Sequence, residues 1–240
     1  MRLPPTVVIR LAPYAPYAPA FIVALPHGIA AGVHLPDAPN PVPTEVLARL
    51  HPDERAHAIT LGGYRQVQFA GGRLALGELF PELGLRRAAV LSNAHGAPLL
   101  PAGVAGSVTH KNDLAIAMLA RGNPGLGIDL EETDRDRPGV AARVLRAEEL
   151  EAVAALPEER RWRDTAVRFS MKEAIYKALH PFLRRYIGFG EVAVWPSPDG
   201  IDRIEPFLGE EAGQFAFDAR HYWVENRVFS TVRVRPRSEG

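Results

Sequence analysis

The amino-acid sequence predicts an α+β fold. Helical patterns dominate residues 44–79 and 147–179, and strand patterns follow both stretches instead of alternating with them one by one. The strand patterns after residue 190 succeed one another as a closing antiparallel set. Helices and strands grouped in this way are typical of α+β proteins.

The composition is that of a globular protein. The chain has 240 residues, of which 47% are hydrophobic and 23% charged, and this length suits one compact unit or two small subdomains. Because 28 basic residues balance 28 acidic ones, the charge gives no reason to expect nucleic acid or an anionic membrane as a partner. Cysteine is absent, which excludes disulfides, thiolate metal sites and cysteine nucleophiles.

Prolines determine the character of the N-terminal region. Ten of the 22 prolines fall within residues 1–43, which predicts extended loop with one strand, at residues 6–11 or 20–24. Prolines also interrupt the apolar stretch near the N-terminus, so we expect no targeting signal. No segment approaches the roughly 20 apolar residues that span a bilayer. We therefore expect a cytoplasmic protein with no membrane partner.

The first half of the chain predicts helices followed by strands. The helical pattern begins at Thr44, resumes at residues 55–61 after a His-Pro pair, and continues as a longer helix over residues 64–79 that Pro81 ends. A turn-rich loop is expected over residues 93–103. The predicted strands cover residues 87–91, 104–109 and 114–119.

The segment Arg-Gly-Asn-Pro-Gly at residues 121–125 is the clearest break in the chain. We place a subdomain boundary there, which gives an N-terminal subdomain of residues 1–125 and a C-terminal subdomain of residues 126–240. The elements predicted for the second subdomain are a strand at 126–131, a charged loop, helices near 147–155 and at 157–179 with Pro181 beyond the end, and strands at 191–195, 214–218 and 222–234.

Two carboxylates share the predicted strand at residues 126–131. Side chains alternate along a strand, so Asp129 and Glu131 point to one side while Ile128 and Leu130 point into the core. Two neighbouring carboxylates repel each other unless a cation or a basic group lies between them. A solvated strand end is the alternative interpretation of this pair taken alone.

A third carboxylate lies on the predicted long helix. Glu173 and Lys177 are four residues apart and therefore share a helical face, which also fits an ordinary surface ion pair. Phe169 and Tyr176 flank Glu173 on that face, so the carboxylate is set among bulky apolar groups. Together with the two acids of the strand, Glu173 would complete a set of three oxygen ligands of the kind that suits Mg²⁺.

A run of small residues precedes a histidine in the first half of the chain. Ser107 and His110 belong to the segment Gly-Ser-Val-Thr-His, and small residues before a histidine suit a backbone that approaches a phosphate closely. A structural histidine is the alternative. Arg65 and Arg73 on the earlier helix are weaker candidates, because arginine is the usual base of a chain that contains only three lysines.

Two motifs resemble those of one enzyme family. Residues 127–131, Gly-Ile-Asp-Leu-Glu, and residues 169–177, Phe-Ser-x-Lys-Glu-Ala-x-x-Lys, resemble the two signatures of the 4′-phosphopantetheinyl transferases of the larger, surfactin-synthetase-activating type. Segments 64–75, 98–110 and 176–189 are most similar to the branch of enterobactin synthetase component D. Leu100 and Lys111 depart from that branch, but neither is among the residues expected to hold metal.

The resemblance implies a fold, a reaction and partners. It implies two similar α+β subdomains in a pseudo-twofold arrangement, with the active site between them, in a monomer. The reaction transfers the 4′-phosphopantetheine arm of coenzyme A, the co-substrate, to a serine of an acyl or peptidyl carrier protein and releases adenosine 3′,5′-bisphosphate. Such enzymes activate nonribosomal peptide, siderophore or polyketide synthases.

The resemblance also implies roles for individual residues. Asp129, Glu131 and Glu173 would hold Mg²⁺, with Mn²⁺ as an alternative, and Glu173 would also be the general base. Lys177 would face the diphosphate as a second catalytic group. The remaining residues expected at coenzyme A are Arg65, Arg73, Ser107, His110 and Lys172, of which Arg73 and His110 are expected on the 3′-phosphate.

The carrier surface and two rival functions remain open at this stage. Residues 182–186, Phe-Leu-Arg-Arg-Tyr, could meet an acidic carrier protein, although a solvated loop is equally compatible with them. A Mg²⁺-dependent nuclease is disfavoured by the zero net charge and by the spacing of Glu173 and Lys177. A non-catalytic protein that binds carrier or coenzyme A is the other alternative, and metal-dependent turnover would exclude it.

Overall fold

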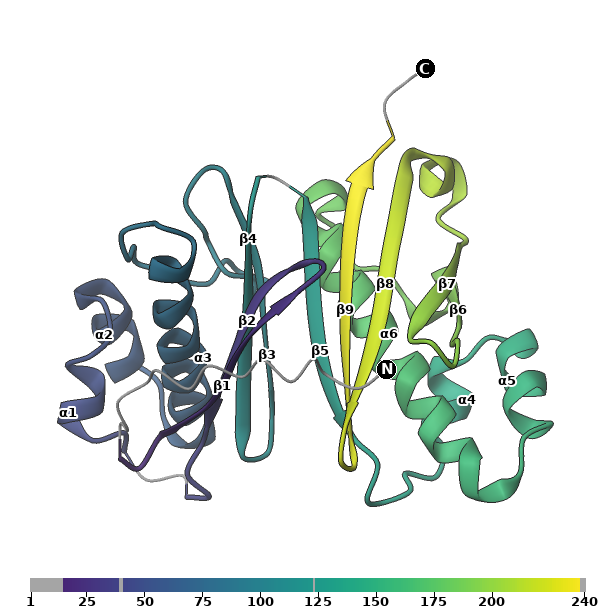
Figure 1. The fold of residues 1–240 in the computed structure, drawn as a ribbon, viewed down its shortest axis with the longest axis horizontal. Helices are drawn as coiled ribbons and strands as arrows, with labels where there is room; N and C mark the ends of the chain where they lie inside the picture. Colours follow the sequence, from purple (N-terminus) through teal and green to yellow (C-terminus); the bar gives the residue numbers. More distant parts are fainter. Residues whose placement is uncertain (1–14, 39–40, 123, 238–240) are drawn as a thin grey trace. The chain divides into compact units, whose positions relative to one another are not determined.

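The computed structural model of the protein describes residues 15–38, 41–122 and 124–237. The chain divides into two compact units, with the division between residues 123 and 124. Each unit combines an antiparallel sheet with one long helix (Figure 1), which confirms the predicted α+β class. The boundary after residue 125, the pseudo-twofold arrangement and the site between the subdomains stay predictions. Among the helices of the described ranges, none has the length and apolarity of a membrane span.

The unit that precedes residue 124 contains a four-stranded sheet in the order β1-β2-β4-β3, with every neighbouring pair antiparallel. Its elements are β1 (Ala18–Leu25), β2 (Gly28–His34), α1 (Thr44–Leu47), α2 (Pro52–Ile59), α3 (Gly63–Glu82), β3 (Val104–Lys111) and β4 (Leu114–Arg121). Helix α3 packs on the sheet at Gly71 and Gly72, where a Cβ would overlap side chains of Leu35 and Val108. Val67, Leu74, Leu76, Leu79 and Phe80 of α3 are buried in the core of this unit.

The N-terminal region holds two strands where the sequence predicted one. The predicted segment 20–24 lies within β1, whereas the alternative at 6–11 falls outside the described residues. Strand β2 was missed because it lacks alternation of polar and apolar residues: Ala30 to Val33 are all buried, and small residues occupy most of the strand.

The predicted strand at residues 87–91 is wrong. Side chains, instead of a neighbouring strand, satisfy the backbone of Val90: its N–H donates to Oε1 of Glu54 at 2.9 Å, and its carbonyl oxygen accepts from Nε of Arg73. Since both backbone groups are bonded in this way, the segment needs no partner strand.

The second unit contains a five-stranded antiparallel sheet in the order β5-β9-β8-β7-β6. Its elements are β5 (Gly125–Glu132), α4 (Val140–Val144), α5 (Ala147–Ala154), α6 (Glu158–Leu183), η1 (Phe189–Glu191), β6 (Val192–Trp195), β7 (Ile201–Pro206), η2 (Gly209–Gln214), β8 (Phe215–Val224) and β9 (Arg227–Pro236). The long helix α6 packs against β5 and β9.

Two glycines of β5 bring the strand and the helix together. A Cβ at Gly125 would overlap the carbonyl oxygen of Ala178, and a Cβ at Gly127 would overlap that of Ala174. Only glycine permits such a close approach of the two backbones. This contact places the next residues of β5 beside the middle of α6.

Several predicted boundaries are corrected by the structure. Helices α3 and α6 continue through Pro81 and Pro181 and end one and two residues later, because a proline in a last turn removes only one hydrogen bond. Residues 219–221, predicted as a gap between two strands, lie inside β8. The chain turns only after the end of β8, at Glu225, whose φ of 53° is typical of a turn. Helix α4 forms in the predicted charged loop, and β7 was missed.

Candidate functional site

The acids of β5 lie on the side of the strand that faces α6. Gly125 and Gly127 meet this helix, and alternation along the strand places Asp129 and Glu131 on the same side. Both acids are buried, with only 6% and 5% of their surface exposed. Ile128, on the opposite face, is also buried. The close contact between strand and helix therefore presents two carboxylates to α6.

Lys177 of α6 meets the first of these acids. Its Nζ donates to Oδ1 of Asp129 at 2.9 Å and to the carbonyl oxygen of Ile128 at 3.0 Å. The lysine therefore supplies positive charge to this end of the acidic pair and ties α6 to β5.

Glu131 meets a second base that the sequence analysis did not consider. Nη1 of Arg137, in the loop between β5 and α4, lies 3.3 Å from Oε2 of Glu131. The Arg137 side chain is 38% exposed, against 7% for the acid that it contacts.

Glu173 completes a cluster of three carboxylates and one lysine. It is half-buried on α6, and its pKa is raised by burial and by the negative charges of Asp129 and Glu131, against the opposing effect of Lys177. Residues that influence each other in this way share one electrostatic environment. We call these four residues, Asp129, Glu131, Glu173 and Lys177, the acidic cluster.

The acidic cluster suits a divalent cation by the chemistry of its donors. Three carboxylates offer the hard oxygen ligands that Mg²⁺ prefers, and a cation would relieve the repulsion that raises the pKa of Glu173. In the described residues, however, no three acidic or histidine side chains are grouped closely enough to hold a metal ion as they stand. Lys177 and Arg137 provide the positive charge in this arrangement.

Lys172 lies apart from the acidic cluster. Its Nζ donates to Oε2 of Glu149 at 2.5 Å and to the carbonyl oxygens of Val144 and Phe189 at 2.8 and 3.0 Å. Burial lowers the pKa of Lys172, although Glu149 opposes this effect. Lys172, a predicted coenzyme A ligand, therefore has three acceptors within the protein, and the structure does not place it beside Lys177.

Glu149, the buried partner of Lys172, was missed by sequence reasoning. It is fully buried and also accepts from the backbone N–H groups of Arg146 and Val194, both at 2.9 Å. The sequence does contain a signal for Glu149: it stands three residues after the N-cap position of α5, where a glutamate forms one half of a capping box.

The four predicted coenzyme A residues of the first unit differ in exposure. Arg73 is buried: its Nη2 donates to Oγ of Ser92 at 2.8 Å, its guanidinium stacks 4.3 Å from the ring centre of Phe69, and burial lowers its pKa to about 10. Arg65 is exposed in the first turn of α3. The two arginines therefore occupy very different environments.

Ser107 and His110 point to opposite faces of β3. His110 shares a face with Val108, which approaches Gly72 of α3, and it is exposed. Ser107 and Thr109 are two residues apart and therefore share the opposite face of β3. Both are buried, and Ser107 has only 2% of its surface exposed. The strand therefore does not direct both side chains to one ligand group.

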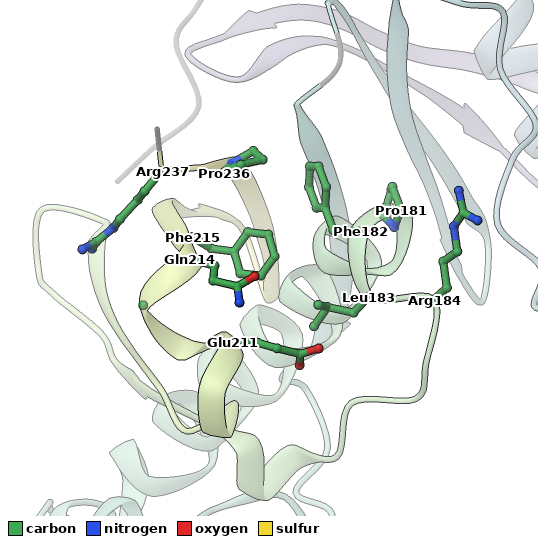
Figure 2. A pocket seen from close by; sticks show the side chains of 10 residues that line it. Pro181, Phe182, Leu183, Arg184, Glu211, Gln214, Phe215, Pro236 and Arg237 are labelled. Carbon is green, nitrogen blue, oxygen red and sulfur yellow. The ribbon is translucent and has the colours of Figure 1, made fainter. Parts of the chain in front are cut away.

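Two hollows border the predicted catalytic helix. A cavity of about 90 Å³ lies beside Glu173 and is lined by Tyr176, Tyr186 and Phe189 among others. A larger groove of about 1040 Å³ lies at the C-terminal end of α6 and is lined by Phe182, Leu183 and Arg184, by residues of η2 and by the end of β9 (Figure 2). Part of the predicted carrier segment 182–186 therefore lines a surface groove.

Two family models match this chain. The model described as the 4′-phosphopantetheinyl transferase superfamily matches residues 125–232, which contain the acidic cluster. The model of the 4′-phosphopantetheinyl transferase N-terminal domain matches residues 53–120. Together the two matches span well over half of the chain.

Proteins with the same family name share sequence with this chain. The 4′-phosphopantetheinyl transferase Svp of Streptomyces mobaraensis is 33% identical over 162 residues, which cover 65% of each protein. The 4′-phosphopantetheinyl transferase Npt of Nocardia iowensis is 31% identical over 61% of this chain and 66% of its own length. The chain therefore spans just under two thirds of the length of these relatives.

A solved structure resembles part of the chain. The holo-[acyl-carrier-protein] synthase of Thermotoga maritima aligns with 47% of this chain and 64% of its own, at 25% sequence identity and a TM-score of 0.39. The two family models, whose matches adjoin along the sequence, carry the assignment. The chain belongs to the 4′-phosphopantetheinyl transferase superfamily.

Proposed function

We propose that this protein transfers the 4′-phosphopantetheine arm of coenzyme A to a serine of an acyl or peptidyl carrier protein. The observation that carries the proposal is the acidic cluster, in which Glu173 and Lys177 of α6 share one environment with Asp129 and Glu131 of β5. The cluster lies within the region that matches the superfamily model.

Glu173 is the general base of this proposal. It takes the proton of the carrier serine while the serine oxygen forms a bond to the phosphorus that carries the pantetheine arm. The bond from this phosphorus to the bridging oxygen breaks, and its electron pair leaves with adenosine 3′,5′-bisphosphate. The raised pKa of Glu173 supports the role, because a stronger base accepts the proton more readily near neutral pH.

The diphosphate of coenzyme A needs positive charge around it. Lys177 provides an ammonium group, on a side chain that is 27% exposed, one helical turn from Glu173. Asp129, Glu131 and Glu173 would hold Mg²⁺, or Mn²⁺ in its place, once Arg137 and Lys177 turn away from the carboxylates. The bound ion would neutralise the diphosphate and the developing charge of the leaving group.

The other end of coenzyme A is assigned to the first unit. Arg73 and His110, with Arg65, would bind the 3′-phosphate, because guanidinium groups suit a phosphate monoester, and Ser107 would donate to a phosphate oxygen of coenzyme A. The exposure of Arg65 and His110 supports these two assignments most directly. Lys172, on α6 of the second unit, is proposed as a coenzyme A ligand by resemblance alone, because its ammonium group already has three protein acceptors.

The carrier partner would be acidic around its modified serine. Arg184 and Tyr186 in the segment 182–186 are exposed, which suits contact with such a protein. Arg185 is less available, because it pairs with Glu191 and Glu211 at 2.9 Å each. Carriers of siderophore, nonribosomal peptide and polyketide synthases are the substrates that we propose for an enzyme acting as a monomer.

A single mass measurement tests this proposal. The purified protein is incubated with coenzyme A, Mg²⁺ and an unmodified carrier domain, and the intact mass of the carrier is measured with and without EDTA. We expect the carrier to gain one phosphopantetheine arm, and EDTA to prevent the gain. Binding of coenzyme A without any gain over several acyl and peptidyl carriers would instead support the non-catalytic alternative.

A further inference from the structure

A separate cavity lies in the unit that begins at residue 124. It has a volume of about 320 Å³, within the usual range of small-molecule pockets. It is lined by the first turns of α6, by the loop that follows β6 and by the end of β8. Glu173 and Lys177 belong to later turns of α6, and no residue of the acidic cluster lines this cavity.

A buried histidine with a fixed orientation faces this cavity. His221 is 4% exposed, and its Nδ1 lies 2.7 and 3.0 Å from the two carboxylate oxygens of Asp202. Asp202 also accepts from the backbone N–H of Ser197 at 2.9 Å. The carboxylate makes Nδ1 the nitrogen that carries the proton, so Nε2 is the ring nitrogen left for the cavity.

Two arginines supply positive charge to the same cavity. Arg160 and Arg163 are three residues apart on α6 and share one face. The guanidinium of Arg163 lies 4.0 Å from the ring centre of Trp223, which holds it in place. Neither arginine forms an ion pair with a carboxylate in the described part of the chain. Asp164 also lines the cavity, but Arg168 neutralises it at 2.6 Å.

We propose that this cavity binds the phosphate group of a small molecule. Arg160 and Arg163 donate hydrogen bonds to the phosphate oxygens, a geometry for which guanidinium groups are suited. Since Nδ1 of His221 faces Asp202, Nε2 accepts a hydrogen bond from a hydroxyl group of the ligand, and hydrogen phosphate is the simplest ligand that carries both groups. The volume leaves space for an organic group attached to the phosphate. The site is separate from the proposed transferase function and uses none of its residues.

Inorganic phosphate and sulfate are the probes for this proposal. Both ions are titrated at pH 7.5 and low ionic strength into the 240-residue protein labelled with ¹⁵N-histidine, and binding is followed by calorimetry and by the imidazole resonances. We expect saturable phosphate binding that shifts the Nε2 resonance of His221. We also expect sulfate, which has no hydroxyl hydrogen for Nε2, to bind at least about tenfold more weakly.

Two double variants locate the phosphate site. Arg160→Gln/Arg163→Gln removes the exposed cations of the cavity, and we expect phosphate binding to weaken at least tenfold. Arg203→Gln/Arg235→Gln makes the same change in charge on exposed arginines elsewhere in this unit and should leave binding unchanged. These variants are preferable to replacement of His221, because that change would leave the buried Asp202 without its partner.

The proposal is overturned by any of three results. One is a His221 resonance that phosphate does not move, and another is equal binding of phosphate and sulfate. The third is a Kd that Arg160→Gln/Arg163→Gln leaves unchanged. Phosphate can also enter the proposed coenzyme A site, so the His221 shift is measured again in His110→Ala, where we expect it to persist. Loss of transferase activity would not affect these readouts, which separates the two proposals.

Discussion

Nζ of Lys177 lies 2.9 Å from Oδ1 of Asp129, and this ion pair joins the two motifs of the sequence in space. The pair forms where Gly125 and Gly127 allow α6 to contact the backbone of β5. Gly127, which begins the first motif, and Gly125 before it therefore have a structural role: they bring the acids of the strand to the lysine and glutamate of the helix.

Replacement of Glu173 by glutamine should nearly abolish transfer to the carrier. Glutamine keeps the size of the side chain but cannot accept the serine proton, and general base catalysis contributes about 10²–10⁴-fold. The rate is measured by the intact mass of the carrier over time. Glu151→Gln, an equivalent change at an exposed position of α5, is the control and should retain full activity.

The stability of Glu173→Gln distinguishes catalytic loss from misfolding. Because Asp129 and Glu131 repel the Glu173 carboxylate, its replacement by a neutral amide should leave the free energy of unfolding unchanged or raise it when no metal is bound. A clearly destabilised variant would show that Glu173 supports the fold instead, and near-normal turnover would remove it from the role of base.

Replacement of Gly127 by alanine should destabilise the second unit. The new Cβ would overlap the carbonyl oxygen of Ala174, which belongs to helix backbone and cannot rotate away. Overpacking costs about 1–3 kcal/mol and more where backbone must move, so we expect a loss of about 3 kcal/mol in urea unfolding. Gly190→Ala, where no atom lies within 4 Å of the added Cβ, is the matched control. Equal stabilities would contradict the close contact of β5 and α6.

Local sequence patterns predicted the acidic cluster because its members follow simple periodicities. Asp129 and Glu131 are two residues apart on a strand, and Glu173 and Lys177 are four apart on a helix. The contacts of Lys172 could not be found in this way, because Glu149, Val144 and Phe189 reach it from three different elements. Tertiary contacts of this kind leave no local pattern.

The strands that were misplaced have the same explanation. Val90 lies in an apolar segment that resembles a strand, but Glu54 and Arg73 bond its backbone from distant helices. His221 lies in the gap that the sequence analysis left between the strands at 214–218 and 222–234. Its contact with Asp202 on the neighbouring strand buries it and lets β8 continue.

Replacement of Lys172 by methionine tests whether this lysine supports the fold or binds coenzyme A. The variant leaves the carboxylate of Glu149 buried without its lysine, and breaking a buried ion pair costs about 3–5 kcal/mol. We expect a loss of this size in the free energy of unfolding, and partial recovery in Lys172→Met/Glu149→Gln, where the buried charge is also removed. Unchanged stability with a raised KM for coenzyme A would show that Lys172 acts as a ligand.

Metal dependence should follow the acids of the cluster. Asp129→Asn removes one negative charge from the three carboxylates that are proposed to hold the ion, so the Mg²⁺ concentration needed for half-maximal transfer should rise at least tenfold. Asp199→Asn, at a position outside the cluster that is fully exposed in a turn, serves as the control. An unchanged Mg²⁺ requirement in Asp129→Asn would exclude Asp129 as a ligand.

The 3′-phosphate of coenzyme A provides the test of His110. A hydrogen bond to a charged group contributes about 1.5–3 kcal/mol, which corresponds to roughly a tenfold or greater rise in KM when His110 is replaced by alanine. The same variant should have an unchanged KM for 3′-dephospho-coenzyme A, because that substrate lacks the group that His110 would contact. His34→Ala, at an exposed position at the end of β2, should affect neither substrate. If His110→Ala raises KM equally for both substrates, the histidine acts elsewhere on coenzyme A or on the fold, and the 3′-phosphate must be bound by other residues.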